Sequence, residues 1–366
     1  MKRTKPPFRA DHVGSLLRPQ ALKDAREKRA KGAISDADLK AVEDREIERV
    51  IKKQEEAGLQ SITDGEFRRS WWHLDFLWGL KGAERFLPTT GVAFAGMNTR
   101  SEGVQVTGKV DFDGHPMIEH FKFVKSHTSR TPKMTIPAPS AIYGRPIKIP
   151  IDAKVYPRLD EMFEDLGKAY RKAVRAFAEA GCRYLQLDEV FIAMLCDPKY
   201  CKQMTDRGDD PEKLGILYGD LINAAMSDIP EDMTITMHLC RGNYKSTFMG
   251  AGGYDAVQEI LFNKVNVHGY FMEYDDERSG GFEPLRMLPK GKTVVLGIMT
   301  TKTGKLETKD ELKRRIDQAA KYAPLDQLCI SGQCGFASTE EGNVLTEDEQ
   351  WAKIRRLVEV ADEVWG

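Results

Sequence analysis

The sequence predicts an α/β fold in which eight parallel strands and their helices form a (β/α)8 TIM barrel. The 366 residues contain eight short apolar or alternating stretches that are typical of strands, and helical stretches separate most of them. Polar residues with reactive side chains follow five of these strands. In a parallel barrel the carboxyl ends of all strands meet at one rim, so we expect these residues to share one site.

Composition excludes several classes of protein. With 41% hydrophobic residues the chain can bury a large core, and a barrel can use residues 1–366 as a single domain. The 55 basic and 56 acidic residues provide no field for nucleic acid or an anionic membrane. No apolar run has transmembrane length and none follows the charged start, so we expect a cytoplasmic protein without a signal peptide. The six cysteines form no CxxC pair, which favours thiols or ligands over disulfides.

The first expected strand, residues 8–13, ends at Gly14 and Ser15. A Gly-Ser turn offers backbone N–H groups and a hydroxyl to an anion, although a plain turn explains the same residues equally well. Ser35 and Asp38 have the spacing of a capping box and predict that an amphipathic helix begins there. This helix would cover the core.

The second expected strand, residues 59–63, ends in Asp64, Gly65 and Glu66. Carboxylates at the carboxyl end of a strand lie where α/β folds place their chemistry, whereas a solvated turn would produce the same triplet. Glu66 is therefore a candidate site residue.

Aromatic residues are concentrated in the segment 67–78. Trp71, Trp72 and His73 could form the wall of a pocket for a flat ligand, or they could anchor a loop. The segment opens an insertion of about residues 67–130, between the second and third strands. Gly-rich alternation in this insertion predicts a hairpin rather than a separate domain.

The regular β/α pattern resumes with a strand at 133–136 and a helix at about 160–180. The next buried strand, 184–187, ends in Asp188 and Glu189. This is the second strand that ends in two carboxylates, so Asp188 joins Glu66 as a candidate site residue.

An imidazole and a thiol lie two residues apart in the strand expected at 234–239. Because side chains alternate along a strand, His238 and Cys240 face the same side. Nitrogen and sulfur donors suit zinc, while core packing would account for a lone pair of this kind.

Two further donors follow later strands: Glu273 and Cys334. Together with His238 and Cys240 they supply the nitrogen, sulfur and oxygen atoms of a zinc site. The remaining strands are expected at 269–274, 293–298 and 327–331, with helices at about 307–322 and 346–364.

These motifs resemble the cobalamin-independent methionine synthases, and the resemblance extends over the whole chain. The His-x-Cys strand, Glu273 and the Cys334 in Gly-Gln-Cys-Gly look like the zinc ligands of that family. The chain is similar to the catalytic, carboxyl-terminal half of the long enzymes and to the short members with one barrel. The resemblance implies a single catalytic domain, bound Zn²⁺ and methyl transfer to the thiol of homocysteine.

The resemblance also implies roles for other residues. Gly14, Ser15, Glu66 and Asp188 match the homocysteine site, with Asp188 and Glu66 on the amino group and the Ser15 turn on the carboxylate. Lys302 lies where the long enzymes have a histidine that gives a proton to the folate. Trp71, Trp72 and His73 are a candidate wall for the donor, 5-methyltetrahydrofolate or its polyglutamate.

Two other functions stay open on the sequence alone. A zinc-thiolate barrel could use a methylated corrinoid, with a partner protein, or another electrophile, and it could alkylate a different thiol. Alternatively the barrel could bind a ligand without catalysis and hold zinc for structure, although structural sites usually have four Cys or His ligands.

Overall fold

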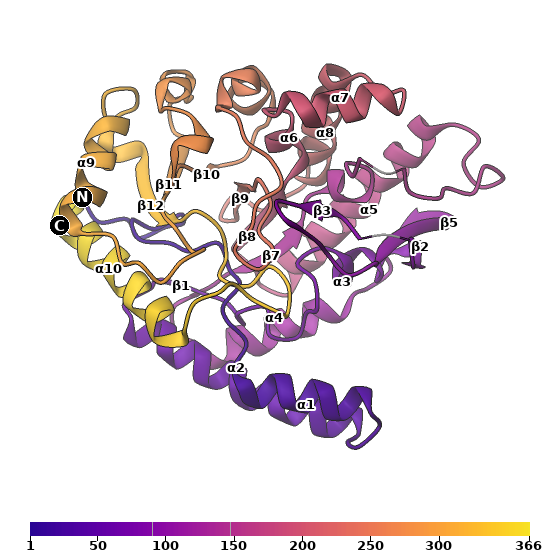
Figure 1. Cartoon of the computed structure of the whole chain (residues 1–366), viewed down its shortest axis with the longest axis horizontal. Coiled ribbons are helices and arrows are strands. Elements are labelled where there is room, and N and C mark those ends of the chain that lie inside the picture. Colours follow the sequence, from indigo (N-terminus) through magenta and orange to yellow (C-terminus); the bar gives the residue numbers. More distant parts are fainter. Residues whose placement is uncertain (90, 147) are drawn as a thin grey trace.

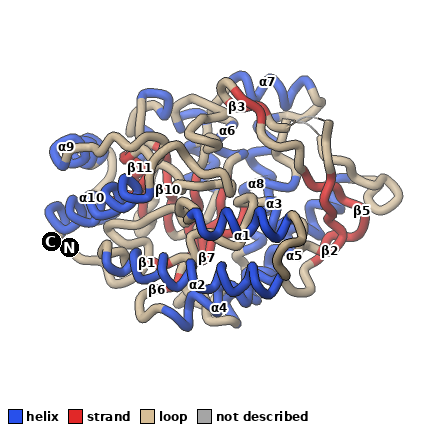
Figure 2. Tube along the Cα trace, turned by 60° about the horizontal axis from the view of Figure 1, so that its bottom comes forward, coloured by secondary structure: helices blue, strands red, loops and turns tan. Residues whose placement is uncertain are grey.

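Parallel strands form the centre of the molecule. The computed structural model describes residues 1–89, 91–146 and 148–366. Figures 1 and 2 show the strands in the middle with helices along the outside. Six neighbouring strands form one parallel sheet in the order β12 (Leu328–Gly332), β11 (Thr293–Met299), β10 (Gly269–Glu273), β9 (Thr234–Leu239), β8 (Tyr184–Glu189) and β7 (Met134–Pro137). Because helices alternate with these strands, the predicted α/β fold is confirmed.

Two further strand segments continue this arrangement. β1 (Ser61–Ile62) pairs in parallel with β6 (Thr131–Pro132), which leads directly into β7. The strand expected at 8–13 is reduced to a parallel bridge between Ala10 and Ile330 of β12. Two backbone hydrogen bonds support this bridge, with N···O distances of 3.0 Å and 2.8 Å. The first segment therefore lies against the far edge strand of the sheet.

Side-chain hydrogen bonds take the place of a backbone ladder on the other side of this first segment. The carboxylate of Asp11, which is fully buried, accepts hydrogen bonds from Ser61 Oγ (2.7 Å), Lys133 Nζ (3.3 Å) and Tyr184 Oη (2.8 Å). Thr63 Oγ1 donates to the carbonyl of Gly14 at 2.7 Å. Because these side-chain hydrogen bonds hold the first segment against its neighbours, the segment stays in place without a longer strand.

Helices cover the strands, and several of them begin at side-chain caps. The predicted capping box of Ser35 and Asp38 is confirmed, and Thr308 and Thr346 form two others. The helices are α1 (Gln20–Ala30), α2 (Asp36–Glu56), α3 (Leu74–Leu77), α4 (Pro116–His127), α5 (Leu159–Glu179), α6 (Phe191–Met194), α7 (Pro198–Asp206), α8 (Pro211–Ala225), α9 (Lys309–Ala319) and α10 (Glu347–Trp365).

The insertion contains two antiparallel pairs rather than one. β2 (Lys81–Phe86) pairs with β5 (Gly103–Asp111), and β3 (Ala93–Phe94) forms a small hairpin with β4 (Met97–Asn98). The hairpin is held against residues that follow β9, since Ala95 N donates to the carbonyl of Phe248 at 2.9 Å. The last part of the expected insertion is helical: α4 packs beside α2 and α5 through its apolar face.

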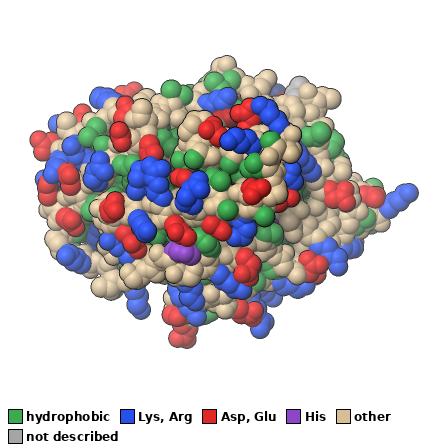
Figure 3. Space-filling view, turned by 90° about the horizontal axis from the view of Figure 1, so that it is seen from below, with side chains coloured by type: hydrophobic (Ala, Val, Ile, Leu, Met, Phe, Trp, Pro, Cys, Tyr) green, Lys and Arg blue, Asp and Glu red, His purple; other side chains and the backbone are tan. Residues whose placement is uncertain are grey.

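The charged residues show no segregation by sign on the face that Figure 3 displays, where acidic and basic side chains are interspersed. Among the described residues, no helix combines the length and apolar character that crossing a membrane requires.

Candidate active site

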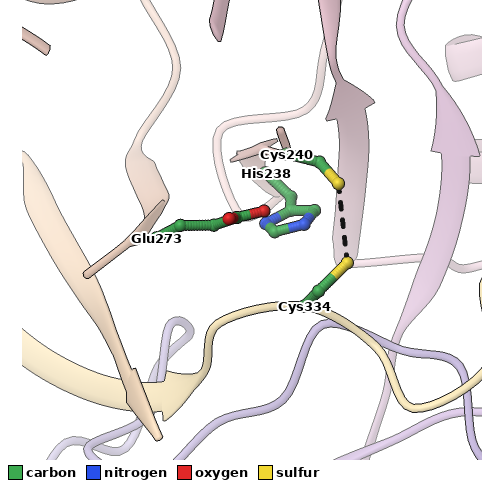
Figure 4. Close-up of side chains that lie close together, drawn as sticks. All are labelled: His238, Cys240, Glu273 and Cys334. Carbon is green, nitrogen blue, oxygen red and sulfur yellow. Dashed lines mark hydrogen bonds between the residues drawn. The ribbon is translucent and has the colours of Figure 1, made fainter. Parts of the chain in front are cut away.

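Four side chains with metal-binding atoms converge at the carboxyl ends of the strands (Figure 4). His238 lies in β9 and Cys240 follows it, Glu273 ends β10, and Cys334 follows β12. One donor atom from each lies within 4.8 Å of the others, and all four residues are buried. Strand alternation turns His238 and Cys240 to the same side, and the parallel register brings the strand ends together.

The donor atoms fit a metal ion because the surrounding protein leaves several without hydrogen bonds. Among the described residues, neither ring nitrogen of His238 has a partner, and Glu273 Oε2 has none. Buried polar atoms of this kind cost free energy unless something else binds them. One nitrogen, two sulfurs and one carboxylate oxygen form a donor set that suits zinc.

The two thiols lie in contact, with a distance of 3.5 Å between Cys240 Sγ and Cys334 Sγ. A proton shared between them lowers the pKa of Cys334 well below its ordinary value and raises the pKa of Cys240 well above it. Gly242 N also donates to Cys240 Sγ at 3.3 Å. This pair therefore favours one thiolate even before any ion binds.

Surrounding residues hold the Glu273 carboxylate in place. Arg241 N donates to Glu273 Oε1 at 2.9 Å, and Arg278 Nη1 lies 3.8 Å from Oε2. The backbone N–H of Glu273 donates to Tyr254 Oη at 2.8 Å. These contacts orient the free oxygen of Glu273 within the cluster of donors.

Two buried carboxylates lie next to the cluster. Asp188 is the register partner of His238, and Gln186 Nε2 donates to Asp188 Oδ1 at 2.7 Å. Burial raises the pKa of Asp188 to about 7, and the negative charge of Glu66 adds to this effect. Burial also raises the pKa of Glu66, whose Oε1 accepts from Thr135 Oγ1 at 2.9 Å. Arg69 Nη1 lies 3.6 Å from Glu66 Oε1 and balances part of the negative charge, and the remainder favours a positively charged ligand group in the cavity that both carboxylates line.

The Gly14–Ser15 turn packs against the segment that follows Cys334. Ser15 Oγ accepts a hydrogen bond from Ala337 N at 3.3 Å. Gly14 has a φ of 142°, and a Cβ there would lie 2.7 Å from the Thr135 side chain, so only glycine fits.

The aromatic segment serves both as a wall and as an anchor. Trp71 Nε1 donates to Glu102 Oε2 at 2.6 Å, which fixes the indole to the insertion. His73 stacks at a tilt on Trp72, with 4.3 Å between ring centroids, and is hydrogen-bonded to Arg145. Burial and the charge of Arg145 lower the pKa of His73 well below its ordinary value.

Most predicted site residues line one cavity. Its walls include Ser15, Glu66, Trp71, Trp72, His73, Asp188, His238, Cys240 and Cys334. Three predicted residues do not line the cavity themselves: Gly14, Glu273 and Lys302. Lys302 is buried, and its Nζ lies 3.3 Å from Oδ1 of Asn243, which lines the cavity.

Comparison with known proteins assigns the chain to a family. The sequence profile of the family described as "Cobalamin-independent synthase, Catalytic domain" matches residues 8–363. The chain belongs to the cobalamin-independent synthase family. It is 49% identical to the uncharacterized protein YxjG of Bacillus subtilis over 100% of this chain and 97% of that protein.

Solved structures of related synthases resemble the whole chain. A candidate vitamin-B12-independent methionine synthase from Listeria monocytogenes is 39% identical, with a TM-score of 0.80 and 100% of both chains covered. A B12-independent methionine synthase from Shewanella, solved in complex with selenomethionine, is 19% identical, with a TM-score of 0.74 and 97% of both chains covered. The similarity to the Shewanella structure, at 19% identity, shows a shared fold.

The cavity of this synthase also contains residues for which the sequence analysis proposed no role. The hairpin contributes Val92, Phe94 and Thr99, and Arg145 enters from the segment after β7. A sequence pattern indicates that a hairpin forms but does not indicate what it covers. Arg145 and Asn243 gave no periodic signal in the sequence, because both lie in irregular segments.

Glu189 differs from its neighbour Asp188. Its side chain points away from the cavity, and its Oε1 accepts hydrogen bonds from the backbone N–H groups of Phe191 and Ile192 at 2.7 and 2.8 Å. Ser140 Oγ donates to Oε2 at 2.5 Å. Of the two carboxylates at this strand end, only Asp188 lines the cavity.

Proposed function

We propose that this synthase is a zinc-dependent methyltransferase that moves a methyl group from 5-methyltetrahydrofolate, or its polyglutamate, to the thiol of homocysteine to give methionine. One observation carries the proposal. Three donors of the buried cluster, His238, Cys240 and Cys334, line the same cavity as the buried carboxylates Glu66 and Asp188. Glu273 supplies the oxygen donor of the cluster from behind the wall. The first set suits a thiol held by a metal, and the second suits the ammonium group of an amino acid. The family match supports the same reaction.

The strands and helices around the site belong to one architecture. We infer a closed (β/α)8 barrel in which residues 1–366 form a single catalytic domain with an insertion of about residues 67–130. The bridge between Ala10 and Ile330 and the pairing of β1 with β6 support closure. Such a barrel places its chemistry at the carboxyl ends of its strands, where the four donors lie.

His238, Cys240, Glu273 and Cys334 would hold the zinc ion. Bound zinc lowers the pKa of a thiol that coordinates it and so provides a thiolate nucleophile at neutral pH. Arg241 and Arg278 hold the Glu273 carboxylate, the one oxygen donor of the set. Oxygen is the donor least suited to a soft metal site, so Glu273 would be the weakest of the four ligands.

The remaining residues orient homocysteine. Asp188 and Glu66 would bind its ammonium group, because their negative charges lie together in a buried place. The turn at Gly14 and Ser15 would bind its carboxylate through the Ser15 hydroxyl and backbone N–H groups. With both ends of the amino acid held, its sulfur reaches the cluster of donors.

The methyl donor would lie against Trp71, Trp72 and His73, which form an apolar wall of the cavity. In the reaction a sulfur–carbon bond forms while the nitrogen–methyl bond breaks, and the folate nitrogen takes a proton. Lys302 is the candidate source of this proton, since its ammonium group contacts Asn243 at the cavity wall.

The test is methionine formation by the purified, zinc-loaded protein from homocysteine and 5-methyltetrahydrofolate, with monoglutamate and triglutamate donors compared. We expect turnover with at least one of them. Loss of turnover in Lys302→Met together with unchanged zinc content would support its role as acid. A zinc-loaded protein that methylates homocysteine only from a methylcorrinoid, or only in the presence of a partner protein, would contradict the folate donor.

A further inference from the structure

A second cavity adjoins the one that contains the donor cluster. It lies between the insertion and the amino-terminal part of α7, and its walls include Val104, Lys199 and Gln203. Four residues line both cavities: Val92, Arg145, Pro146 and Met249. The two cavities therefore share part of their walls, and an elongated molecule that passes these residues would reach both.

The two cavities differ in size. The cavity at the donor cluster has a volume of about 70 Å³, and the second has a volume of about 430 Å³ on the same measure. The smaller space suits an amino acid and the methyl-bearing end of a donor, and the rest of an elongated donor would extend into the larger one. Much of the wall of the second cavity is apolar, which suits a flat organic body.

The basic residues that line the second cavity are not paired with its acidic residues. Its cations are Arg145, Lys148 and Lys199, and among the described residues none of them has a carboxylate within 4.0 Å. Arg145 bonds instead to the carbonyl of Glu102 at 3.1 Å and to His73. All three cations are thus able to bind an external anion.

The two acids that line the second cavity are already engaged. Glu102 accepts from Trp71 Nε1 and forms ion pairs with Arg85 and Arg100. Asp197 caps α7, and it accepts hydrogen bonds from Lys199 N at 2.8 Å and Ala251 N at 3.0 Å. The available charge in this cavity is therefore positive.

We infer that the second cavity binds the distal, carboxylate-bearing end of the methyl donor, with Lys148 and Lys199 on its carboxylates and Arg145 between the two cavities. The inference rests on the proposed function, because it assumes that the donor is an elongated organic anion. The ligand that fits this cavity is a flat apolar body that ends in carboxylate groups. Lys148 and Lys199 would then determine affinity for the donor without taking part in methyl transfer.

Binding of N-(4-aminobenzoyl)glutamate, which has an aromatic ring and two carboxylates, tests the inference by calorimetry without any reaction. The wild-type protein should bind it, more weakly at high salt. The double variant Lys148→Gln/Lys199→Gln should bind at least about tenfold more weakly, because charge-assisted hydrogen bonds are lost. Lys202→Gln is the control: it makes the same change on α7, the helix that carries Lys199, and lies outside the cavity wall.

A second variant tests the space rather than the charge. Gln203 is exposed and lines the cavity, so Gln203→Trp should fill it without disturbing the core. It should weaken binding of the probe as the double variant does. No binding to the wild-type protein, or equal binding to wild type and both variants, would overturn the inference.

Kinetics separate this inference from the proposed function. In the double variant the KM for 5-methyltetrahydrofolate should rise about tenfold, while kcat and the KM for homocysteine stay unchanged. Turnover that is normal in both variants would reject the second cavity and leave the proposed function intact. Probe binding that depends on the lysines, without any methionine formation, would reject the folate donor and leave the cavity assignment intact.

Discussion

His238 is the clearest sign that the donor cluster is more than core packing. A histidine in a packed core normally has a hydrogen-bond partner for at least one ring nitrogen, yet neither nitrogen of His238 has one among the described residues. The thiols of Cys240 and Cys334 lie beside it in mutual contact. Each of these groups gains a partner if one ion binds them all.

Replacing one thiol tests that reading. Cys334→Ser should reduce both the bound zinc and the rate of methionine formation by about 100-fold or more, since a hydroxyl is a poor ligand for a soft site. Metal analysis and a methionine assay measure the two effects. Cys201→Ser, which changes a half-buried thiol outside the cluster, should retain both. A Cys334→Ser protein with full zinc content would contradict the ligand assignment.

The charge of Asp188 should matter more than its size. Asp188→Asn keeps an oxygen that accepts from Gln186 but removes the negative charge offered to the ammonium group. The KM for homocysteine should rise by roughly 10- to 100-fold, which corresponds to the loss of one charge-assisted hydrogen bond of about 1.5–3 kcal/mol. Steady-state kinetics at fixed donor concentration measure it. An unchanged KM for homocysteine would remove Asp188 from the site.

At the scale of elements, α4 shows how a histidine can cap the start of a helix. His115 Nδ1 accepts from Met117 N at 3.1 Å, and its Nε2 lies 3.2 Å from the carbonyl of Phe76. This arrangement needs the neutral ring, with one nitrogen as acceptor and the other as donor. Burial lowers the pKa of His115 to about 4, although its hydrogen bond to Phe76 opposes this effect.

Folding stability should therefore depend on pH through this residue. Because the folded state lowers the pKa of His115 from 6.5 to about 4, its contribution is complete above pH 6.5 and is lost as the pH falls towards 4. In His115→Asn the cap remains and the titration disappears. The difference in unfolding free energy between wild type and variant should change by up to about 3 kcal/mol between pH 7 and pH 4, by urea unfolding. A difference that stays constant over this range would contradict the account.

The sequence was most informative about long, regular elements and about strand ends. The strands that carry His238, Glu273 and Asp188 were predicted because buried runs and their polar ends are local features. The first strand was predicted too long because side chains, especially that of Asp11, replace its ladder. The hairpin over the cavity and the position of Arg145 depend on contacts between distant residues, so no local pattern predicts them.

At the scale of the whole molecule, Asp11 connects the first segment to several strands at once. Its carboxylate binds side chains from β1, β8 and the residue between β6 and β7, and Lys133 is its buried counter-charge. The Lys133 ammonium also lies 4.2 Å from the ring centroid of Phe271 in β10. Groups from opposite sides of the sheet thus meet at one point.

Removing Asp11 should destabilise the whole fold. Asp11→Ala leaves the charge of Lys133 buried without a partner and should lower the free energy of unfolding by about 3–5 kcal/mol. The double variant Asp11→Ala/Lys133→Met should recover most of this loss. With the single variant Lys133→Met to complete the cycle, urea unfolding of all four proteins gives the coupling. A loss below about 1 kcal/mol in Asp11→Ala would show that the pair does not hold the strands together.

The bridge between Ala10 and Ile330 also has a consequence for biosynthesis. A ribosome adds about 5–20 residues per second, so residue 10 emerges on the order of half a minute before its partner at 330. Cys334 emerges later still. The nascent chain must therefore wait with an unpaired sheet edge and an incomplete donor cluster until residue 334 has emerged, and all four donors can act together only after that.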